Sequence, residues 1–116
     1  METIKSYTDL QQSRKLAEIL PLESADMYYD RGRLPSLIDK YVTHESIKTD
    51  KYQHLIPCWS LVSLLSVLPD YTLQTSTDGT VFVVCESKKP VISGAYDNPL
   101  DACYEMIIRL HELNLL

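Results

Sequence analysis

The chain has 116 residues, of which 45% are hydrophobic and 23% charged, and its formal net charge at pH 7 is -5. This length and apolar content suit a single domain over residues 1–116 and exclude disorder along the whole chain. The acidic balance argues against nucleic acid as a partner, because sequence-independent binding to phosphates depends on clustered Lys and Arg.

The first predicted helix begins near Thr8. Thr8 and Gln11 have the spacing of a capping box, in which two side chains satisfy free N–H groups of the first turn. Pro21 is expected to end this helix, because proline cannot continue the hydrogen-bond ladder. A turn and a short strand, Met27 to Tyr29, should follow. The apolar face of the helix is Leu10, Leu16, Ala17 and Leu20.

Residues 34–54 show no dominant period, so we expect either an irregular ordered segment or a functional loop. Residues 31–57 hold five bases and three acids, whereas both flanking parts of the chain are acidic. Tyr41 and Tyr52 lie among these bases, a composition typical of adaptable binding surfaces. A solvated surface segment would have the same composition, and both interpretations stay open.

An uncharged run of fifteen residues extends from Leu55 to Pro69. It is shorter than the roughly 20 apolar residues that cross a bilayer, and the N-terminus has no apolar targeting segment, so we expect a cytoplasmic protein without membrane contact. Leucines at i, i+3, i+4 and i+7 predict a central helix that Pro69 closes, with Trp59 on its Ser-bearing face. These leucines are Leu61, Leu64, Leu65 and Leu68.

A β-hairpin is predicted between Tyr71 and Glu86. Asp78-Gly79 is a dipeptide favoured in two-residue type I′ turns, and this turn would pair Thr77 with Thr80. A third short strand is expected at Val91 to Ser93. The predicted register places on one face Tyr71, Leu73, Phe82 and Val84.

The last helix is predicted from Asn98, a preferred N-cap, followed by Pro99 at the first helical position and Asp101 in the first turn. Its core face is Leu100, Cys103, Met106, Ile107 and Leu110. A second apolar flank, which one small sheet would leave uncovered, consists of Tyr104, Ile108, His111 and Leu115.

Together these elements predict an α+β fold with three helices packed on a small antiparallel sheet built around the hairpin. The predicted core is Leu10, Leu16, Leu20, Leu61, Leu64, Leu65, Leu68, Leu73, Phe82, Val84, Cys103, Met106, Ile107 and Leu110.

Local catalytic signatures are absent from the sequence: neither GxGxxG, a Walker loop, GxSxG nor HExxH occurs. Cys58 is the weak candidate for catalysis, because a position near a helix N-terminus and close to His54 would favour a thiolate. The plainer interpretation is a buried cysteine. The three cysteines are widely spaced without a CxxC pair, so we expect free thiols. Cys58, His44, His54 and His111 lack the paired spacing of zinc sites, so no metal or cofactor is expected.

Binding residues are the remaining candidates. Trp59 is either an interface anchor or part of the core. Tyr41 and Tyr52 mark the basic middle segment as one binding surface, and the flank of Tyr104, Ile108 and His111 is another. The expected partner is a protein or a second copy of this chain.

Three blocks of the sequence together resemble a family of small uncharacterised proteins encoded on prophages and other mobile elements of gut bacteria. The blocks are "QQSRKLAEILPLESADM", "IPCWSLVSLLSVLP" and "NPLDACYEMIIRLHELNLL". The resemblance implies a genetic context; it implies no activity, cofactor or site residue.

Our leading functional hypothesis is a non-enzymatic cytoplasmic interaction protein of a phage or mobile element that binds another protein or itself. The alternative is a small cysteine-dependent enzyme centred on Cys58. A nucleic-acid-binding module ranks third.

Overall fold

The computed structural model describes residues 5–31, 33–51, 54–86 and 90–116. The chain divides into two compact units. The N-terminal unit is Tyr7–Ser63, and the C-terminal unit is Leu64–Leu116 together with the first residues of the chain. The division falls inside the helix α3 (Leu61–Val67). The single domain expected over residues 1–116 stays a prediction.

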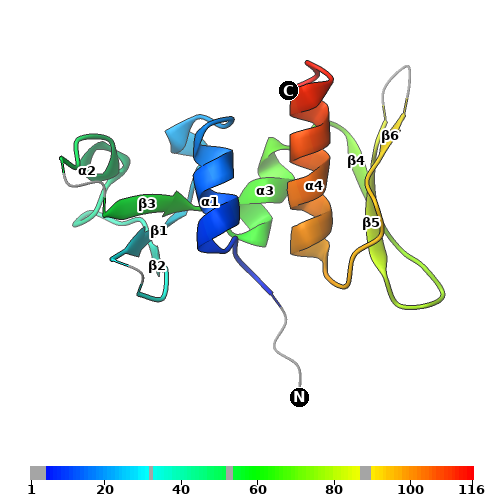
Figure 1. Ribbon diagram of the computed structural model, residues 1–116, viewed down its shortest axis with the longest axis horizontal. Helices are drawn as coiled ribbons and strands as arrows, with labels where there is room; N and C mark the ends of the chain where they lie inside the picture. The colour runs from blue at the N-terminus through cyan, green and yellow to red at the C-terminus, as the bar shows by residue number, and fades with distance from the viewer. Residues whose placement is uncertain (1–4, 32, 52–53, 87–89) are drawn as a thin grey trace. The chain divides into compact units, whose positions relative to one another are not determined.

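The N-terminal unit contains a three-stranded antiparallel sheet with the strand order β2-β1-β3 (Figure 1). Its central strand β1 pairs on one side with β2 and on the other with β3. The helix α1 packs against β3, and α2 contacts both β3 and the short 3-10 helix η1. The elements are α1 (Leu10–Ala17), η1 (Leu22–Ser24), β1 (Met27–Asp30), β2 (Ser36–Leu37), α2 (His44–Lys48) and β3 (Leu55–Cys58).

The capping box of α1 lies one residue later than the sequence predicts. Asp9 is the N-cap, and its carboxylate accepts from the N–H of Gln12 at 2.8 Å while the Asp9 N–H donates to the Gln12 side chain at 3.1 Å. Thr8 is fully buried, and its hydroxyl lies 2.8 Å from the Ser13 hydroxyl. Because that hydroxyl is engaged inside the unit, the adjacent Asp9 caps the helix.

The helix α1 also ends before Pro21, at Ala17. Leu16 and Leu20 are buried as predicted, whereas Leu10 is half-buried and Ala17 is exposed. The predicted apolar face is therefore correct only at Leu16 and Leu20.

The strand predicted at Met27 to Tyr29 is confirmed as β1. Within residues 34–54 the described part forms β2 and the short helix α2. Thr43 caps α2 by accepting from the Ser46 N–H at 3.2 Å, and the Ser46 side chain accepts from the Thr43 N–H in return. The sequence pattern of a capping box has Glu or Gln where this helix has Ser46, so the pattern does not identify the start of α2.

The uncharged run from Leu55 to Pro69 is a strand followed by a helix. Its first residues form β3, and α3 begins only at Leu61 and ends at Val67, before Pro69. Cys58 is therefore the last residue of a strand, and Trp59 lies between the two elements rather than on a helix face. Leu64 and Leu68 are buried, but Leu61 and Leu65, also predicted as core, are half-buried.

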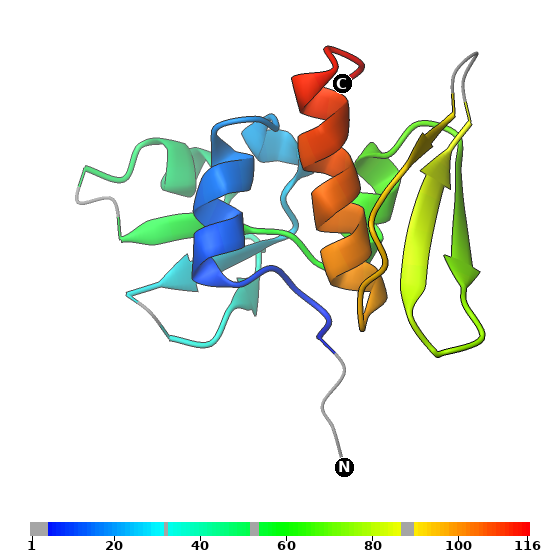
Figure 2. The same cartoon turned by 45° about the vertical axis from the view of Figure 1, so that its right-hand side comes forward.

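The C-terminal unit contains a second antiparallel sheet with the order β4-β5-β6. The predicted third strand is confirmed as β6. Figure 2 shows α4 lying along this sheet, where it contacts β5 and β6. The elements are β4 (Tyr71–Thr75), β5 (Val81–Cys85), β6 (Val91–Ile92) and α4 (Pro99–Glu112).

The hairpin forms as predicted, but its turn is one residue longer. Ser76 pairs with Thr80 through a 2.8 Å bond from the Ser76 N–H to the Thr80 carbonyl, so the loop has the three residues 77–79. Gly79 has a φ of +88°, whereas Asp78 does not have the positive φ that a type I′ turn requires at both positions. The Asp78 carboxylate accepts from the Thr80 N–H and hydroxyl, and these bonds hold the pKa of Asp78 below its usual value and favour the longer loop.

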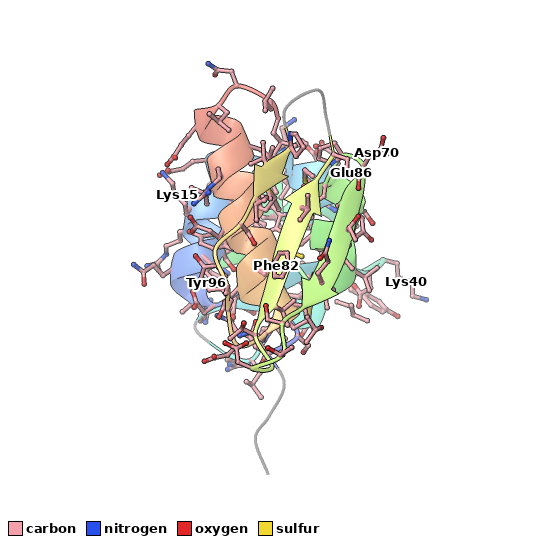
Figure 3. The ribbon with its side chains drawn as sticks, turned by 90° about the vertical axis from the view of Figure 1, so that its right-hand side faces the viewer. Lys15, Lys40, Asp70, Phe82, Glu86 and Tyr96 are labelled. Carbon is pink, nitrogen blue, oxygen red and sulfur yellow. The ribbon has the colours of Figure 1, made fainter. Side chains whose placement is uncertain are left out.

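The extra loop residue changes which cross-strand neighbours share a face. Leu73 lies opposite Val83 instead of Val84. The buried face of β5 consists of Val81, Val83 and Cys85. Phe82, labelled over β5 in Figure 3, is only half-buried. The predicted core positions Phe82 and Val84 are therefore wrong, because the prediction assumed the two-residue turn. Leu73 was also predicted as core, but it is 39% exposed because β4 is an edge strand.

The last helix is confirmed. The Asn98 side chain accepts from the Asp101 N–H at 2.9 Å, and Pro99 occupies the first helical position. Glu105 and Arg109 lie 4.0 Å apart as an exposed i, i+4 pair. All residues of its predicted core face are buried, namely Leu100, Cys103, Met106, Ile107 and Leu110.

The α+β character is confirmed, whereas three helices on one sheet is not the observed arrangement. In the described ranges there are four α-helices and two three-stranded antiparallel sheets. The sheet that the sequence did not predict consists of strands of two to four residues without clear alternation, so periodicity could not identify it. None of the helices seen in these ranges is long and apolar enough to span a bilayer.

Candidate functional site

Cys58 lies in a buried polar cluster at the start of α1. Its Sγ atom is 3.4 Å from the Thr8 carbonyl oxygen, which also accepts from the Tyr29 hydroxyl at 2.7 Å. The side chain of Cys58 is fully buried. Burial raises the pKa of the Cys58 thiol, and the hydrogen bonds with Thr8 and Ser13 offset only part of that effect. These properties are the opposite of those that a nucleophilic thiolate needs.

His54 does not assist Cys58. The two residues stand at opposite ends of β3, and four residues along a strand span roughly 13 Å. The His54 ring nitrogens instead lie 3.5 Å from an Asp50 oxygen and 3.8 Å from an Asp30 oxygen. The fold therefore separates the two groups that the cysteine-enzyme hypothesis combines.

Trp59 is a core residue with no exposed surface. Its indole N–H donates to the Ser24 hydroxyl at 2.9 Å, and its backbone N–H donates to the Thr8 hydroxyl at 3.1 Å. Because both the backbone and the indole of Trp59 are held by hydrogen bonds, its ring is a rigid wall inside the unit and not an exposed stacking platform.

One side of that wall borders a concave surface of the N-terminal unit, which we call the apolar hollow. It has a volume of about 220 Å³. Ala17 of α1, Leu22 of η1 and Leu20 from the connection between them line one side of it. On the opposite side, Ile47 of α2 and two residues of β3, Leu55 and Pro57, complete the apolar lining together with Trp59.

A second concavity, of about 550 Å³, adjoins the apolar hollow. The two share Ala17, Leu55 and Pro57, so they form one continuous surface along β3. The second concavity adds Ile56 and Arg14. A chain segment could therefore extend from the apolar hollow past Arg14.

The ionisable residues that line this surface are both cations, Lys48 in the apolar hollow and Arg14 in the second concavity. Both side chains are exposed, and neither forms an ion pair with any residue that the structure describes. Lys15, the neighbour of Arg14, lies outside the lining and 3.8 Å from Glu18. An apolar surface flanked by two unpaired cations is electrostatically suited to an anionic ligand.

The residues predicted to bind partners do not form one site. Tyr41 is 79% exposed at a turn, with the Lys40 ammonium 5.1 Å from its ring centroid. Asp39 accepts from the N–H groups of Tyr41 and Val42, and these bonds hold its pKa below the usual value. Tyr52 lies outside the described residues. Tyr104 and Ile108 on α4 are half-buried, while His111 and Leu115 are exposed.

Sequence reasoning missed most of the apolar hollow. Neither of the two cations of this surface, Arg14 and Lys48, is among the residues that the sequence predicts to bind a partner. The sequence feature that could have indicated this surface is the uncharged segment Leu55–Pro57, which precedes the leucines of α3. By sequence alone this segment is taken for the start of that helix, and only its pairing with β1 identifies it as a strand.

Metal binding finds no support in the described ranges, which contain no group of three or more His, Cys, Asp or Glu side chains that could hold an ion. The His44 ring nitrogen Nε2 lies 2.7 Å from the Ala25 carbonyl oxygen and so links α2 to the residue that follows η1. All three cysteines are free and buried, as expected for the thiols.

No protein-family model, no curated protein and no solved structure matches this chain. Function is therefore argued from the residues and their geometry.

Proposed function

We propose that this protein is a non-enzymatic interaction protein that binds a short segment of a partner protein in the apolar hollow. The observation that carries the proposal is the lining of this surface, which is apolar except for two cations in a chain of net charge -5. The segment that fits combines an apolar anchor residue with nearby Asp or Glu.

The apolar part of the lining supplies affinity. A buried anchor side chain that fills a preformed pocket contributes most of the free energy at many protein interfaces. Trp59 lies behind this lining with no exposed surface, and its indole is fixed by the Ser24 hydroxyl. The lining is therefore preformed, and little conformational entropy is lost when a ligand packs against it.

The two cations supply selectivity. Carboxylates of the bound segment would meet Arg14 and Lys48, and the same positions would repel a basic segment. Exposed charges of this kind act mainly on association rate and partner choice.

The two other hypotheses have weaker support. The cysteine enzyme needs an accessible thiolate, whereas Cys58 is buried and its pKa is raised. A nucleic-acid-binding module would rely on the few bases of residues 31–51 in an acidic protein. The origin in a prophage or mobile element and the cytoplasmic location stay predictions.

The test is selection from a displayed library of random peptides on the wild-type protein, followed by counter-selection on an Arg14→Glu, Lys48→Glu double variant. We expect enrichment of peptides with one or two large apolar residues beside Asp or Glu. A selected peptide, labelled with fluorescein, should bind the double variant at least tenfold more weakly by fluorescence anisotropy, because two attractions become repulsions.

The matched control is Lys15→Glu, which makes the same charge change on α1 outside the lining. It should leave the affinity nearly unchanged. Trp59, the single tryptophan of the chain, gives a second readout because a bound segment changes its fluorescence. Failure to enrich any peptide, or equal loss of affinity in the control, would refute the proposal.

A further inference from the structure

The open edge of the C-terminal sheet is a second surface, independent of the apolar hollow. The strand β4 is at the edge of the order β4-β5-β6, and all five of its residues are exposed. Figure 3 shows β5 between β4 and β6, so one side of β4 has no neighbouring strand of this sheet.

The hydrogen bonds to β5 show which backbone groups of β4 remain unpaired in the sheet. Glu86 donates to the Asp70 carbonyl and Ser76 donates to the Thr80 carbonyl, both at 2.8 Å. In an antiparallel ladder, alternate residues direct their N–H and C=O groups to the same neighbour. The even-numbered residues of β4 therefore face β5, and Tyr71, Leu73 and Thr75 present their backbone groups to the open side.

The other sheet edges are protected in ways that β4 is not. In the described ranges, β2 has two residues and follows Pro35, and β3 contains Pro57. The edge strand β6 has two residues, and the Arg109 guanidinium donates to its Ile92 carbonyl at 2.8 Å. The strand β4 has five regularly paired residues without proline or charge, and such an edge pairs readily with another strand.

The side chains at this edge are also incompletely covered. Leu73 lies opposite Val83, and Tyr71 opposite Cys85, on the face that is buried in β5. Val83 has no exposed surface, yet Leu73 is 39% and Tyr71 40% exposed. The apolar layer beneath α4 therefore continues to the edge strand and ends there in solvent.

We infer that β4 pairs antiparallel with β4 of a second copy, with the twofold axis passing between the two Leu73 residues. In this register Leu73 lies opposite Leu73, and Tyr71 lies opposite Thr75. Every outward N–H and C=O of these three residues then gains a partner, and the two sheets become one six-stranded sheet. The apolar strips of Tyr71 and Leu73 become continuous across the axis.

Charge favours a second copy in this orientation. The segment from Tyr71 to Thr77 is uncharged, and Asp70 and Asp78 stand at its two ends. Antiparallel pairing places Asp70 opposite Ser76, whereas parallel pairing in register would place the two Asp70 carboxylates side by side, which is unfavourable. Two copies of β4 are therefore electrostatically compatible when they pair antiparallel, and not when they pair parallel in register.

The test is the solution mass by sedimentation velocity over a range of protein concentrations. Wild type should shift from monomer to dimer as concentration rises. Leu73→Lys should weaken dimerisation at least tenfold, because it places two like charges opposite each other at the axis. Thr77→Lys, the same charge change in the exposed hairpin loop, should leave the dimer intact.

A mixing experiment tests the register. Leu73→Lys and Leu73→Glu should each be monomeric alone and should form a heterodimer when mixed, because position 73 meets itself only in this register. Circular dichroism would confirm that both variants are folded. Leu73→Pro is a second probe, since it removes an N–H that faces solvent and leaves the ladder to β5 intact.

A wild-type protein that stays monomeric at millimolar concentration would overturn this inference. So would a dimer unaffected by both Leu73→Lys and Leu73→Pro. The Arg14→Glu, Lys48→Glu variant should dimerise normally, so the inference and the proposed function can fail separately.

Discussion

The two units of this protein hold their interiors together in different ways. Of the four buried polar side chains in the described ranges, the N-terminal unit contains Thr8, Ser13 and Ser63, and the C-terminal unit contains only Ser93. The N-terminal sheet is anchored to α1 by hydrogen bonds that converge on Thr8. The C-terminal sheet is instead covered by the apolar face of α4.

The cost of burying polar groups explains what this difference means. A buried hydroxyl is stable only when hydrogen-bonded, so the N-terminal unit depends on a few specific partners. Thr8 illustrates this: its buried hydroxyl lies 2.8 Å from the Ser13 hydroxyl and accepts from the Trp59 N–H at 3.1 Å. The stability of an apolar layer depends mainly on the total volume of the apolar side chains that it buries, so it tolerates exchanges between apolar side chains of similar size better. We therefore expect the two units to respond differently to substitution.

The largest effect is expected in the apolar layer. Met106→Ala removes most of a fully buried side chain of α4 and should lower the free energy of unfolding by about 2–5 kcal/mol, because it loses apolar burial and leaves a cavity. Urea unfolding followed by circular dichroism would measure it. Leu115→Ala, at a residue that is 53% exposed, is the control and should change stability little.

Equal, small effects of Met106→Ala and Leu115→Ala would show that the face of α4 is not tightly packed. The contrast between the two units would then be wrong.

A smaller but more specific effect is expected in the polar cluster. Thr8→Val keeps the shape of the side chain and removes the hydroxyl that meets Ser13 and the Trp59 N–H. Leaving buried donors unsatisfied should cost about 1–3 kcal/mol. The same urea titration applies, with the exposed Thr72→Val as the matched control.

The Trp59 backbone N–H donates to the Thr8 hydroxyl. The unfolding transition of Thr8→Val should therefore also be visible in tryptophan fluorescence. An unchanged midpoint in both signals would mean that the hydroxyl does not stabilise the N-terminal unit.

The smallest effect concerns pH and can be tested at one titrating group in each unit. Burial raises the pKa of Cys103 from 9.0 to about 12, with the nearby Cys85 adding to the shift, and it raises the pKa of Tyr29 from 10.0 to about 12. Both groups hold their protons more tightly in the folded state. The contribution of these two groups to stability should therefore be fully present below pH 9 and should be lost as the pH rises toward about 12.

Free energies of unfolding measured between pH 9 and about 12 would test whether stability falls as the pH rises. Cys103→Ala and Tyr29→Phe each remove one titration, so each should make the decline shallower than in wild type. A decline that is unchanged in both variants would assign the alkaline loss of stability to other groups.

Much of the C-terminal unit could be predicted from its sequence. Asn98, Pro99 and Asp101 locate the start of α4, because capping depends on residues within one turn. Its core face follows from helical spacing, and the dipeptide Asp78-Gly79 locates the hairpin. The register was wrong by one residue, since it depended on the φ of Asp78, which its own hydrogen bonds to Thr80 decide.

Less of the N-terminal unit, and little of the candidate site, could be predicted. The strand β3 resembles the start of a helix because it precedes the leucines of α3 without a break in hydropathy. Arg14 and Lys48 are separated by more than thirty residues, and only the packing of α1 and α2 against β3 places them beside one surface.

The sequence by itself determined the local features of this protein: the start of α4, the existence of the hairpin, the presence of β1 and the absence of local catalytic motifs. Each of these depends on residues that are close in the chain. Only the tertiary structure decided that Cys58 is buried, that Trp59 is a fixed wall of the apolar hollow and that β4 is an unprotected edge. Those properties depend on contacts between residues far apart in the chain, which no local pattern encodes.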